Sequence, residues 1–349
     1  MKKIHILHEN PEWLIPLSEA LDEQGLPYQE WLLDEGTVPF HEAPPEGVFY
    51  NRMSASSHTR GHRYAPELTL ATLHWLECHG RRILNDHRAL HLEISKLAQY
   101  HALETVGLRT PHTIAAVGRE SLQQAAESLG RTPFILKPNR GGKGLGVQLF
   151  HSIPAMLDFV EQLPPEEQPI DGTWLVQEYV QPREPFITRC EFIGREFFYA
   201  VQVDTSEGFE LCPADACEVG GDFCPTTEAP NKFRILSGVD DPDLLRGYKA
   251  VMEANGIEVA GFEFIRGPNG ELFTYDINTN TNYNSRAEQE AQLDVTAMQR
   301  LATVLGRELD RILVQPRRIL QVGQIMEVFT RELVHTPEML RQQLDSQTA

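Results

Sequence analysis

Apolar and polar positions alternate between strand-like and helix-like stretches at the start of the chain. Short apolar runs predict strands over Ile4–Leu7 and Gly47–Asn51, and a helical pattern covers Glu12–Gln24 before Gly25 ends it. Strands that alternate with helices are typical of an α/β unit. We therefore expect an α/β domain at residues 1–88.

Helices surround a single strand in the next segment. Apolar residues at helical spacing predict one long helix over Leu90–Val106, with Gly107 as its stop signal. A second helix is expected over Ser121–Leu129, a strand over Phe134–Lys137, and a third helix from about Pro154.

Past residue 173 the pattern becomes mostly strands, interrupted by a helix for which Asp241-Pro242 supplies the N-cap and first residue. A glycine-rich turn, Gly267–Gly270, joins the last two strands, and a final long helix is expected from about Ser285. The strands are expected over Trp174–Val180, Phe186–Ile193, Glu196–Val203, Ile257–Arg266 and Glu271–Asn278. The expected division of the chain is 1–88, 89–175, 176–312 and a C-terminal extension at 313–349.

Composition indicates a globular protein, because 41% of the 349 residues are hydrophobic and 23% are charged. Acidic residues outnumber basic ones by 50 to 31, which gives a net charge of −19. This field repels nucleic acid and anionic membranes, so we expect neither as a partner. His5, His8 and Glu9 interrupt any apolar core of a signal peptide. Five cysteines fit reduced thiols and a cytoplasmic location.

Three of the cysteines, Cys212, Cys217 and Cys224, lie close together in the sequence. Their C-x4-C-x6-C spacing matches no common zinc pattern, because it lacks a close CxxC pair. Reduced cysteines in a substrate loop are the favoured interpretation, and a metal site is the alternative.

A glycine-rich stretch, Lys137-Pro-Asn-Arg-Gly-Gly-Lys-Gly-Leu-Gly146, follows its predicted strand directly. Its backbone can turn several N–H groups toward one point, which suits phosphate oxygens, and Lys137 could reach them from the strand end. The stretch matches neither the P-loop nor the GxGxxG motif, so a mobile glycine hairpin is an equal alternative to a nucleotide lid. Lys143 is interpreted as a solvated lid residue.

Acidic and amide side chains gather on the last two predicted strands. Residues two apart share a face, so Thr274, Asp276 and Asn278 are expected to point one way and Tyr275 into apolar packing. A regular hairpin would place Glu263 opposite Thr274 and diagonal to Asp276, about 7–8 Å away, which Mg²⁺ can bridge. A carboxylate at Glu263, in an apolar strand, is costly unless it is paired or binds metal. A polar sheet face covered by a basic partner is the alternative.

Two further groups are candidates for ligand contacts. Val176-Gln-Glu-Tyr-Val180 becomes polar before Pro182, and such a strand end offers backbone groups to an adenine edge. Arg52, after a strand of the first domain, is a candidate for holding a substrate carboxylate or for a structural role. Asn280 and Asn282, in a polar segment, either cradle an acceptor substrate or belong to a turn-rich loop.

Together these markers resemble the ATP-grasp family, particularly its RimK-like branch of amino-acid ligases, over about residues 85–305. The resemblance implies an α/β (α+β) ATP-grasp fold with an N-terminal Rossmann-like α/β domain and two α+β subdomains that enclose ATP. Its motifs are Ser95-Lys96, Lys137-Pro with the glycine loop, Gln177-Glu178-Tyr179-Val180, Arg189, and Glu263 with Asp276-Ile277-Asn278.

The resemblance also implies roles for residues. Arg189 and Lys137 would act on the transferring phosphate, and Glu178 and Val180 would meet the adenine. A surface position for Lys96 and a cross-strand ion pair for Arg189 are the structural alternatives. The ATP contacts implied are Lys96, Lys137, Gly142, Gly144, Gln177, Glu178, Tyr179, Val180 and Glu184, and the Mg²⁺ ligands, with Mn²⁺ as a substitute ion, are Glu263, Asp276 and Asn278.

The chain departs from the family pattern at two places. The family more often has Asp on the first metal strand and Glu-x-Asn on the second, whereas here Glu263 and Asp276 exchange the acids. The family also tends to place an acid for the ribose just before Arg189, where this chain has Ile187 and Thr188. Glu184 is the nearest substitute, so the ribose contact is left open.

The function implied is that of an ATP- and Mg-dependent ligase, which makes an acyl phosphate that an amine then attacks. The acid and amine are expected to be small molecules or peptides, and a homo-oligomer is left open. Two alternatives stand beside it: an ATP-grasp kinase that phosphorylates a small molecule, and a non-catalytic ATP-binding regulatory protein.

Overall fold

The computed structural model describes residues 2–142, 144–206 and 232–314. Within them, residues up to Leu309 form one compact unit that contains three β-sheets. The predicted cysteine cluster, Lys143 and most of the C-terminal extension lie outside the described residues. No helix in the described part of the chain is long and apolar enough to cross a membrane.

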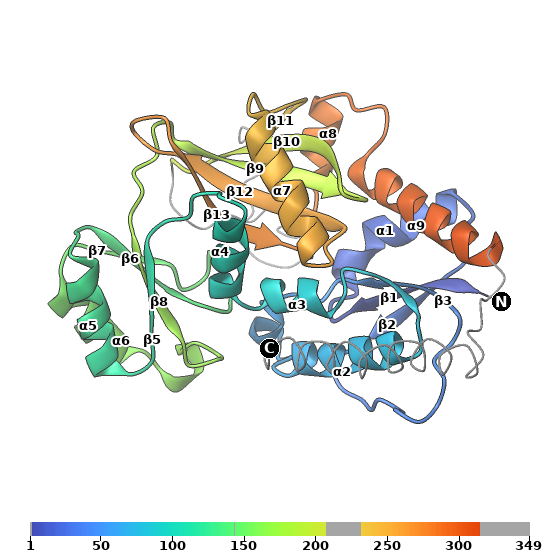
Figure 1. The fold of residues 1–349 in the computed structure, drawn as a ribbon, viewed down its shortest axis with the longest axis horizontal. Helices are drawn as coiled ribbons and strands as arrows, with labels where there is room; N and C mark the ends of the chain where they lie inside the picture. The colour runs from blue at the N-terminus through green and yellow to red at the C-terminus, as the bar shows by residue number, and fades with distance from the viewer. Residues whose placement is uncertain (1, 143, 207–231, 315–349) are drawn as a thin grey trace, which may run out of the picture. The chain divides into compact units, whose positions relative to one another are not determined.

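The first sheet is parallel, with the strand order β2-β1-β3-β4 (Figure 1). Every residue of its central strand β3 is buried, as is usual for a parallel sheet between helices. This is the Rossmann-like domain that the sequence predicts. Its elements are β1 (Lys3–His8), η1 (Glu12–Leu14), α1 (Ile15–Glu23), β2 (Tyr28–Leu32), β3 (Gly47–Asn51), η2 (Ser57–Arg60), α2 (Ala65–Cys78) and β4 (Arg82–Leu84).

The second sheet is antiparallel, with the order β5-β8-β6-β7, and α5 and α6 cover one of its faces (Figure 1). Leu122, Phe134 and Trp174 pack together in the core between these layers. The glycine-rich loop connects β6 to β7, so the buried strand β6 fixes the start of the loop. The elements are β5 (Thr113–Ala116), α5 (Arg119–Leu129), β6 (Phe134–Pro138), β7 (Gln148–Phe150), α6 (Ile153–Gln162), η3 (Pro165–Glu167) and β8 (Trp174–Glu178).

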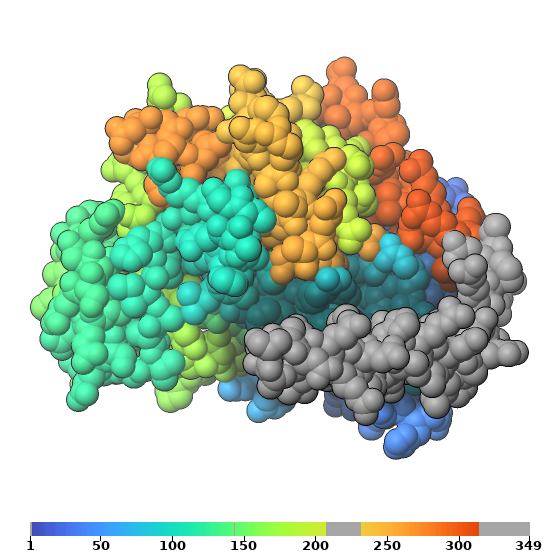
Figure 2. All heavy atoms as spheres, in the orientation of Figure 1, coloured from blue at the N-terminus to red at the C-terminus, as the bar shows by residue number. Residues whose placement is uncertain are grey.

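The third sheet is antiparallel, with the order β11-β10-β9-β12-β13. One face packs against α4 and α7, which Figure 2 shows side by side, and the rings of Tyr248 and Phe262 stack there with centroids 4.3 Å apart. Because side chains alternate along a strand, the neighbours of these core residues point to the opposite face. The elements are α3 (His87–Glu93), α4 (Lys96–Thr105), β9 (Phe186–Ile193), β10 (Glu196–Asp204), β11 (Phe233–Leu236), α7 (Pro242–Ala254), β12 (Val259–Arg266), β13 (Leu272–Asn278), α8 (Ser285–Glu290) and α9 (Ala297–Val314).

Two predicted long helices are each a pair of helices. The helix expected over Leu90–Val106 breaks at Ser95, whose extended backbone and hydroxyl cap α4 by accepting a hydrogen bond from the Ala98 N–H. The helix expected from Ser285 ends at Glu290, and α9 starts only at Ala297. Both errors arose because apolar spacing continues across a break that a polar cap produces.

Other boundaries agree within a few residues, and some elements were not predicted at all. The strand expected over Trp174–Val180 ends at Glu178. This strand includes residue 175, where a domain boundary is expected, and the division of the chain into domains stays a prediction. The elements missing from the prediction are β2, η2, α2, β4, β5, β7, η3 and β11.

A buried asparagine, Asn85, joins the first domain to the third sheet. Its side-chain amide donates to the carbonyls of Val259 and Thr279, and its carbonyl oxygen accepts from the N–H groups of Glu258 and Val259, all at 2.8–3.1 Å. Its φ of 56° lies in the left-handed region, which asparagine tolerates better than most residues.

We predict that Asn85→Ala lowers the free energy of unfolding by about 3 kcal/mol or more, because it leaves several buried backbone groups without partners. Chemical denaturation measures the loss. Asn255→Ala is the matched control, since among the described residues the Asn255 side chain donates to the Val251 carbonyl of the adjoining helix α7 and to no other group. Equal losses in the two variants would show that Asn85 does not link the domains.

Candidate functional site

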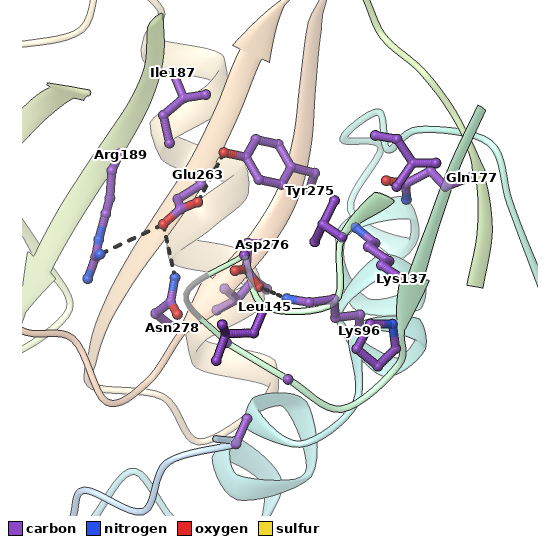
Figure 3. A pocket seen from close by; sticks show the side chains of 18 of the residues that line it. Lys96, Lys137, Leu145, Gln177, Ile187, Arg189, Glu263, Tyr275, Asp276 and Asn278 are labelled. Carbon is purple, nitrogen blue, oxygen red and sulfur yellow. Dashed lines mark hydrogen bonds and ion pairs between the residues drawn. The ribbon is translucent and has the colours of Figure 1, made fainter. Parts of the chain in front are cut away.

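A large cleft is lined by both the second and the third sheet, and α4 begins at its edge (Figure 3). Its empty volume is about 1580 Å³, including the part open to solvent. Lys137 of β6, Arg189 of β9, Glu263 of β12, Asp276 of β13 and Lys96 of α4 all line it. Residues that are far apart in the sequence therefore meet in one place, as the resemblance implies.

The charged residues of the third sheet form a row across neighbouring strands. Arg189 pairs with Val201 on β10 and with Glu263 on β12, and Glu263 pairs with Asp276 on β13. The Arg189 Nη1 lies 3.7 Å from the Glu263 Oε1, and the Lys96 Nζ lies 2.5 Å from the Asp276 Oδ1. Each acid therefore has a cation beside it, and Figure 3 shows these pairs on one side of the sheet.

A β-bulge at Tyr275 corrects the predicted register. Glu263 lies directly opposite Asp276, and Phe264 lies opposite Thr274, so Tyr275 is an extra residue on β13. Thr274 points into the core, where its hydroxyl lies 2.8 Å from that of Tyr248, and Tyr275 lines the cleft and donates to Glu263 at 3.0 Å. The expectation that Thr274 shares a face with Asp276 and Asn278, and that Tyr275 is packed away, is wrong because the bulge reverses the alternation.

Arg189 is buried, with 4% of its surface exposed, and it lies over a glycine. Its Nε is 2.7 Å from the Glu191 Oε1, and its Nη2 donates to the Thr281 hydroxyl. A Cβ at Gly261 would come within 2.4 Å of the Arg189 Nε, so only glycine leaves room for the guanidinium there. Burial opposes the charged form, but Glu191 and Glu263 outweigh it and raise the pKa of Arg189.

The two lysines have different surroundings. Lys96 is the first residue of α4, and although burial would lower its pKa, the Asp276 carboxylate raises the pKa of Lys96. Lys137 donates to the Tyr100 hydroxyl at 2.7 Å, and burial together with the charge of Lys96 lowers the pKa of Lys137 to about 7. A polyanion in the cleft would supply the negative charge that Lys137 lacks.

The donor set at Glu263 fits a divalent cation. Burial and the neighbouring Asp276 carboxylate raise the pKa of Glu263, because two acids share a small space. The Asn278 amide nitrogen donates to the Glu263 Oε1 at 3.3 Å, and Asn278 lines the cleft together with the two acids. Carboxylate and amide oxygens are the ligands that Mg²⁺ prefers, so these residues can hold it.

Most predicted nucleotide residues line the cleft, and their roles remain predictions. The Glu178 carboxylate is engaged within the protein, since it accepts from the His112 N–H at 2.8 Å and from Arg131. Glu184 is not among the described residues that line the cleft, and its carboxylate lies 3.6 Å from the Arg183 Nε. Those that line it are Lys96, Lys137, Gly142, Gly144, Gln177, Glu178, Tyr179 and Val180.

The three predicted substrate residues come together, but Arg52 is turned toward the protein. Arg52 donates to the Asn280 Oδ1 at 3.1 Å and to the Asn282 Oδ1 at 2.8 Å, and 3% of its surface is exposed. Asn280 and Asn282 line the cleft, whereas Arg52 is not among its described lining residues. The geometry favours a positioning role for Arg52, which holds the asparagine loop at the cleft.

Several residues at the site were not predicted from the sequence. Tyr100 accepts from Lys137 and from Gln177, and it donates to the Tyr275 carbonyl, so it connects three elements. Glu93 accepts from the backbone N–H groups of Ala55 and Thr279. A tyrosine or an acid on an amphipathic helix gives no sequence signal for such roles, because only the tertiary packing creates the partners.

No family model matches the chain. It is 27% identical over 202 residues to a probable alpha-L-glutamate ligase of Xanthomonas euvesicatoria pv. vesicatoria (strain 85-10), covering 58% of this chain and 62% of the relative. A probable alpha-L-glutamate ligase of Xylella fastidiosa (strain M12) is 24% identical over 202 residues, covering 58% of this chain and 61% of the relative. The chain therefore spans about three fifths of the length of these relatives.

Solved structures resemble a larger part of the chain. The ATP-grasp ligase PsnB, complexed with a minimal precursor, matches with a TM-score of 0.61 and 16% identity, covering 88% of this chain and 99% of its own. A RimK domain ATP-grasp protein from Sphaerobacter thermophilus DSM 20745 matches with a TM-score of 0.59 and 15% identity, covering 86% and 98%. D-cycloserine synthetase DcsG also has a TM-score of 0.59, at 16% identity, covering 88% and 99%.

These similarities define the class of protein: the chain has the ATP-grasp fold, with a Rossmann-like domain before two α+β subdomains. Within that fold, the chain is similar in sequence to probable alpha-L-glutamate ligases, and the RimK domain protein has the same fold.

We predict that Gly261→Ala lowers turnover by roughly 100-fold, because the new methyl group displaces the Arg189 guanidinium from its place beside Glu263. Overpacking should also lower the free energy of unfolding by about 1–3 kcal/mol, which chemical denaturation measures in parallel with the turnover assay. Gly238→Ala is the control, since a Cβ there meets nothing within 4 Å. Wild-type turnover in Gly261→Ala would contradict the position assigned to Arg189.

We predict that binding of ATP takes up a proton at pH 8. In the free protein Lys137, with a pKa of about 7, is mostly neutral at this pH, and the phosphates would restore its charge. The affinity for ATP should therefore fall as the pH rises above 7. The fall is up to about tenfold per pH unit, until the pH reaches the pKa of Lys137 in the ATP complex. Calorimetry in buffers of different ionisation enthalpy counts the proton. The Lys137→Met variant should take up fewer protons than the wild-type protein when ATP binds, and equal proton uptake would disprove this role for Lys137.

Proposed function

We propose that this protein is an ATP- and Mg²⁺-dependent ligase that joins a carboxylate to an amine through an acyl phosphate. The observation that carries the proposal is the convergence of three basic residues, Lys96, Lys137 and Arg189, with the Glu263 and Asp276 carboxylates in one cleft. Phosphoryl transfer needs alignment and positive charge around the moving group rather than a protein nucleophile. This set of charges meets both needs.

In the first step, a carboxylate oxygen of the substrate attacks the γ-phosphorus of ATP, and ADP leaves with the bridging oxygen. Lys137 and Arg189 neutralise charge on the transferred group, and Lys96, fixed by Asp276, holds the other phosphates. In the second step, an amine nitrogen attacks the acyl carbon, and phosphate leaves with the electrons of the C–O bond. The nitrogen gives up its proton to the departing phosphate or to solvent.

Water must be kept from the acyl phosphate between the two steps. We assign this task to the glycine-rich loop. Two observations support the assignment: Gly142 and Gly144 line the cleft, and a Cβ at Gly142 would lie 3.6 Å from the Ser56 Cβ of the first domain.

Glu263, Asp276 and Asn278 would hold Mg²⁺, which when bound supplies charge neutralisation between the phosphates. The same oxygen donors accept Mn²⁺. The PsnB ligase has also been solved with Mg and ADP beside its minimal precursor, which supports nucleotide and metal in this fold.

The substrates are proposed by class. The sequence relatives are probable alpha-L-glutamate ligases. The solved structures of PsnB and of the macrocyclase MdnC, which are similar in fold to this chain, contain precursor peptides. An amino acid or a peptide is therefore proposed as the acid, the amine or both. The shared length with the relatives is too short to extend their named activity to this chain. We add a cytoplasmic location to the proposal, from the reduced-cysteine interpretation, and leave a homo-oligomer open.

The proposal is tested by positional isotope exchange in ATP labelled at the β,γ-bridging oxygen. We predict that the acid substrate alone, found by screening carboxylates, scrambles the label in the presence of Mg²⁺, and that hydroxylamine traps a hydroxamate. The amine alone should scramble nothing, because it has no activated partner. Asp276→Asn should reduce exchange at least 100-fold, whereas Asp243→Asn, an exposed acid on α7, should not.

Three outcomes separate the functions. Exchange with hydroxamate and amine-dependent release of phosphate supports the ligase. A stable phosphorylated product without hydroxamate shows an ATP-grasp kinase. Binding of ATP without exchange, with every carboxylate of the screen, shows a nucleotide-binding protein and rejects the ligase.

A further inference from the structure

A second, smaller pocket lies beside the cleft, on the far side of Arg189. Its empty volume is about 380 Å³, and it shares Ile187, Arg189, Glu263 and Asn282 with the main cleft. A molecule in this side pocket would therefore reach the place where Arg189 meets the transferred group.

The outer wall of the side pocket is apolar. The strands β9, β10 and β11 contribute Ile187, Val201, Val203 and Phe233, which share the face of the sheet that carries Arg189. No charged side chain on this wall, among the described residues, interrupts them. The wall therefore favours an apolar group of a ligand.

The charges of the side pocket are unfavourable for an anion. Among its described lining residues Arg189 is the one cation, and it already lies beside both acids, Glu191 at 2.7 Å and Glu263 at 3.7 Å. Glu191 offsets the charge of Arg189, and Glu263 is a proposed Mg²⁺ ligand, so the described lining leaves no cation for a carboxylate of the ligand. A carboxylate here would meet Glu191 without a cationic partner, whereas a hydrogen-bond donor would meet an acceptor.

The hydroxyl of Tyr283 is a further polar group in the lining of the side pocket. Its side chain is buried, with 8% exposed, and its hydroxyl has no hydrogen-bond partner in residues 2–142, 144–206 and 232–314. Burial and the charge of Glu191 raise the pKa of Tyr283 well above its usual value, so the hydroxyl stays neutral. A buried hydroxyl without a partner costs stability, which a ligand that donates or accepts a hydrogen bond would recover.

Glu191 has spare capacity for a donor as well. Its carboxylate accepts from the Thr281 hydroxyl at 2.9 Å and lies beside Arg189, and a carboxylate offers about four acceptor positions. An ammonium group has three N–H donors, which suits Glu191 and the oxygen of Tyr283 together.

We propose that the side pocket binds the amine substrate, that Glu191 and Tyr283 hold its ammonium group, and that the amine carries an apolar substituent rather than a second carboxylate. The ammonium gives one proton to Glu191 before its nitrogen attacks the acyl carbon, and the nitrogen loses the second proton to the departing phosphate or to solvent. This rests on the proposed ligase function and narrows it. The amine is then a primary amine such as an apolar amino acid amide or the N-terminus of an apolar peptide. Glutamate is excluded as the amine.

The binding test uses L-phenylalanine amide and L-glutamate as probes, titrated by calorimetry into protein with Mg²⁺ and a non-hydrolysable ATP analogue. The amide should bind at least tenfold more tightly than glutamate. Tyr283→Phe should weaken binding of the amide about tenfold, because it loses a hydrogen bond to a charged group. Tyr50→Phe is the matched control and should leave binding of the amide unchanged. It also removes a buried hydroxyl that has no hydrogen-bond partner among the described residues, but Tyr50 is not in the described lining of either pocket.

The second readout is amine-dependent release of phosphate, in which the KM for the amine should rise about tenfold in Tyr283→Phe and stay at the wild-type value in Tyr50→Phe. The proposal is overturned if the amide does not bind, if glutamate binds as tightly, or if Tyr283→Phe and Tyr50→Phe behave alike. Loss of exchange in Tyr283→Phe would place the acid in the pocket instead. If the wild-type protein shows no exchange, the ligase function fails, and the calorimetry still decides whether this pocket binds amines.

Discussion

The pairing register of β9, β12 and β13 is the constraint on which the site depends. It places Arg189, Glu263 and Asp276 directly opposite one another on neighbouring strands, so that their charges lie in one row. The bulge at Tyr275 maintains this row while the start of β13 keeps Thr274 in the core. Without the extra residue, a hairpin in the predicted register would place Thr274 opposite Glu263, and Asp276 would lie farther from its partner.

The same register explains why the exchanged acids are compatible with the resemblance. The family more often has Asp on the first strand and Glu on the second, and this chain has Glu263 and Asp276. Because the two residues are paired across β12 and β13, either order places two carboxylates side by side above the sheet. Glu263 and Asp276 differ in side-chain length, and each lies beside its own basic residue, Arg189 beside Glu263 and Lys96 beside Asp276.

The sequence predicts the strands that carry the site better than the geometry between them. Local signals identify Phe186–Ile193 and place Lys137 and the glycine loop after a buried strand. The bulge escapes prediction because the contacts made on either side of it, such as Thr274 with Tyr248, join residues on different elements. The break at Ser95 escapes for a similar reason, since the Asn139 side chain accepts from the Leu97 N–H across the domain. The local sequence pattern predicts the helices and strands, whereas contacts between them determine where each one ends and in which register the strands pair.

Burial separates the three cations that sequence reasoning treats alike. Arg189 and Lys96 have acidic partners, so each is charged without a ligand, whereas Lys137 has a tyrosine hydroxyl and loses charge readily. A chain with a net charge of −19 can bind a polyanion only where local cations outweigh the field. In the proposed function, a phosphate ligand would restore the charge of Lys137. Beyond Arg189, which Glu191 already pairs, the side pocket offers acceptors rather than free cations, so the two ends of the site differ in the ligand groups that they favour.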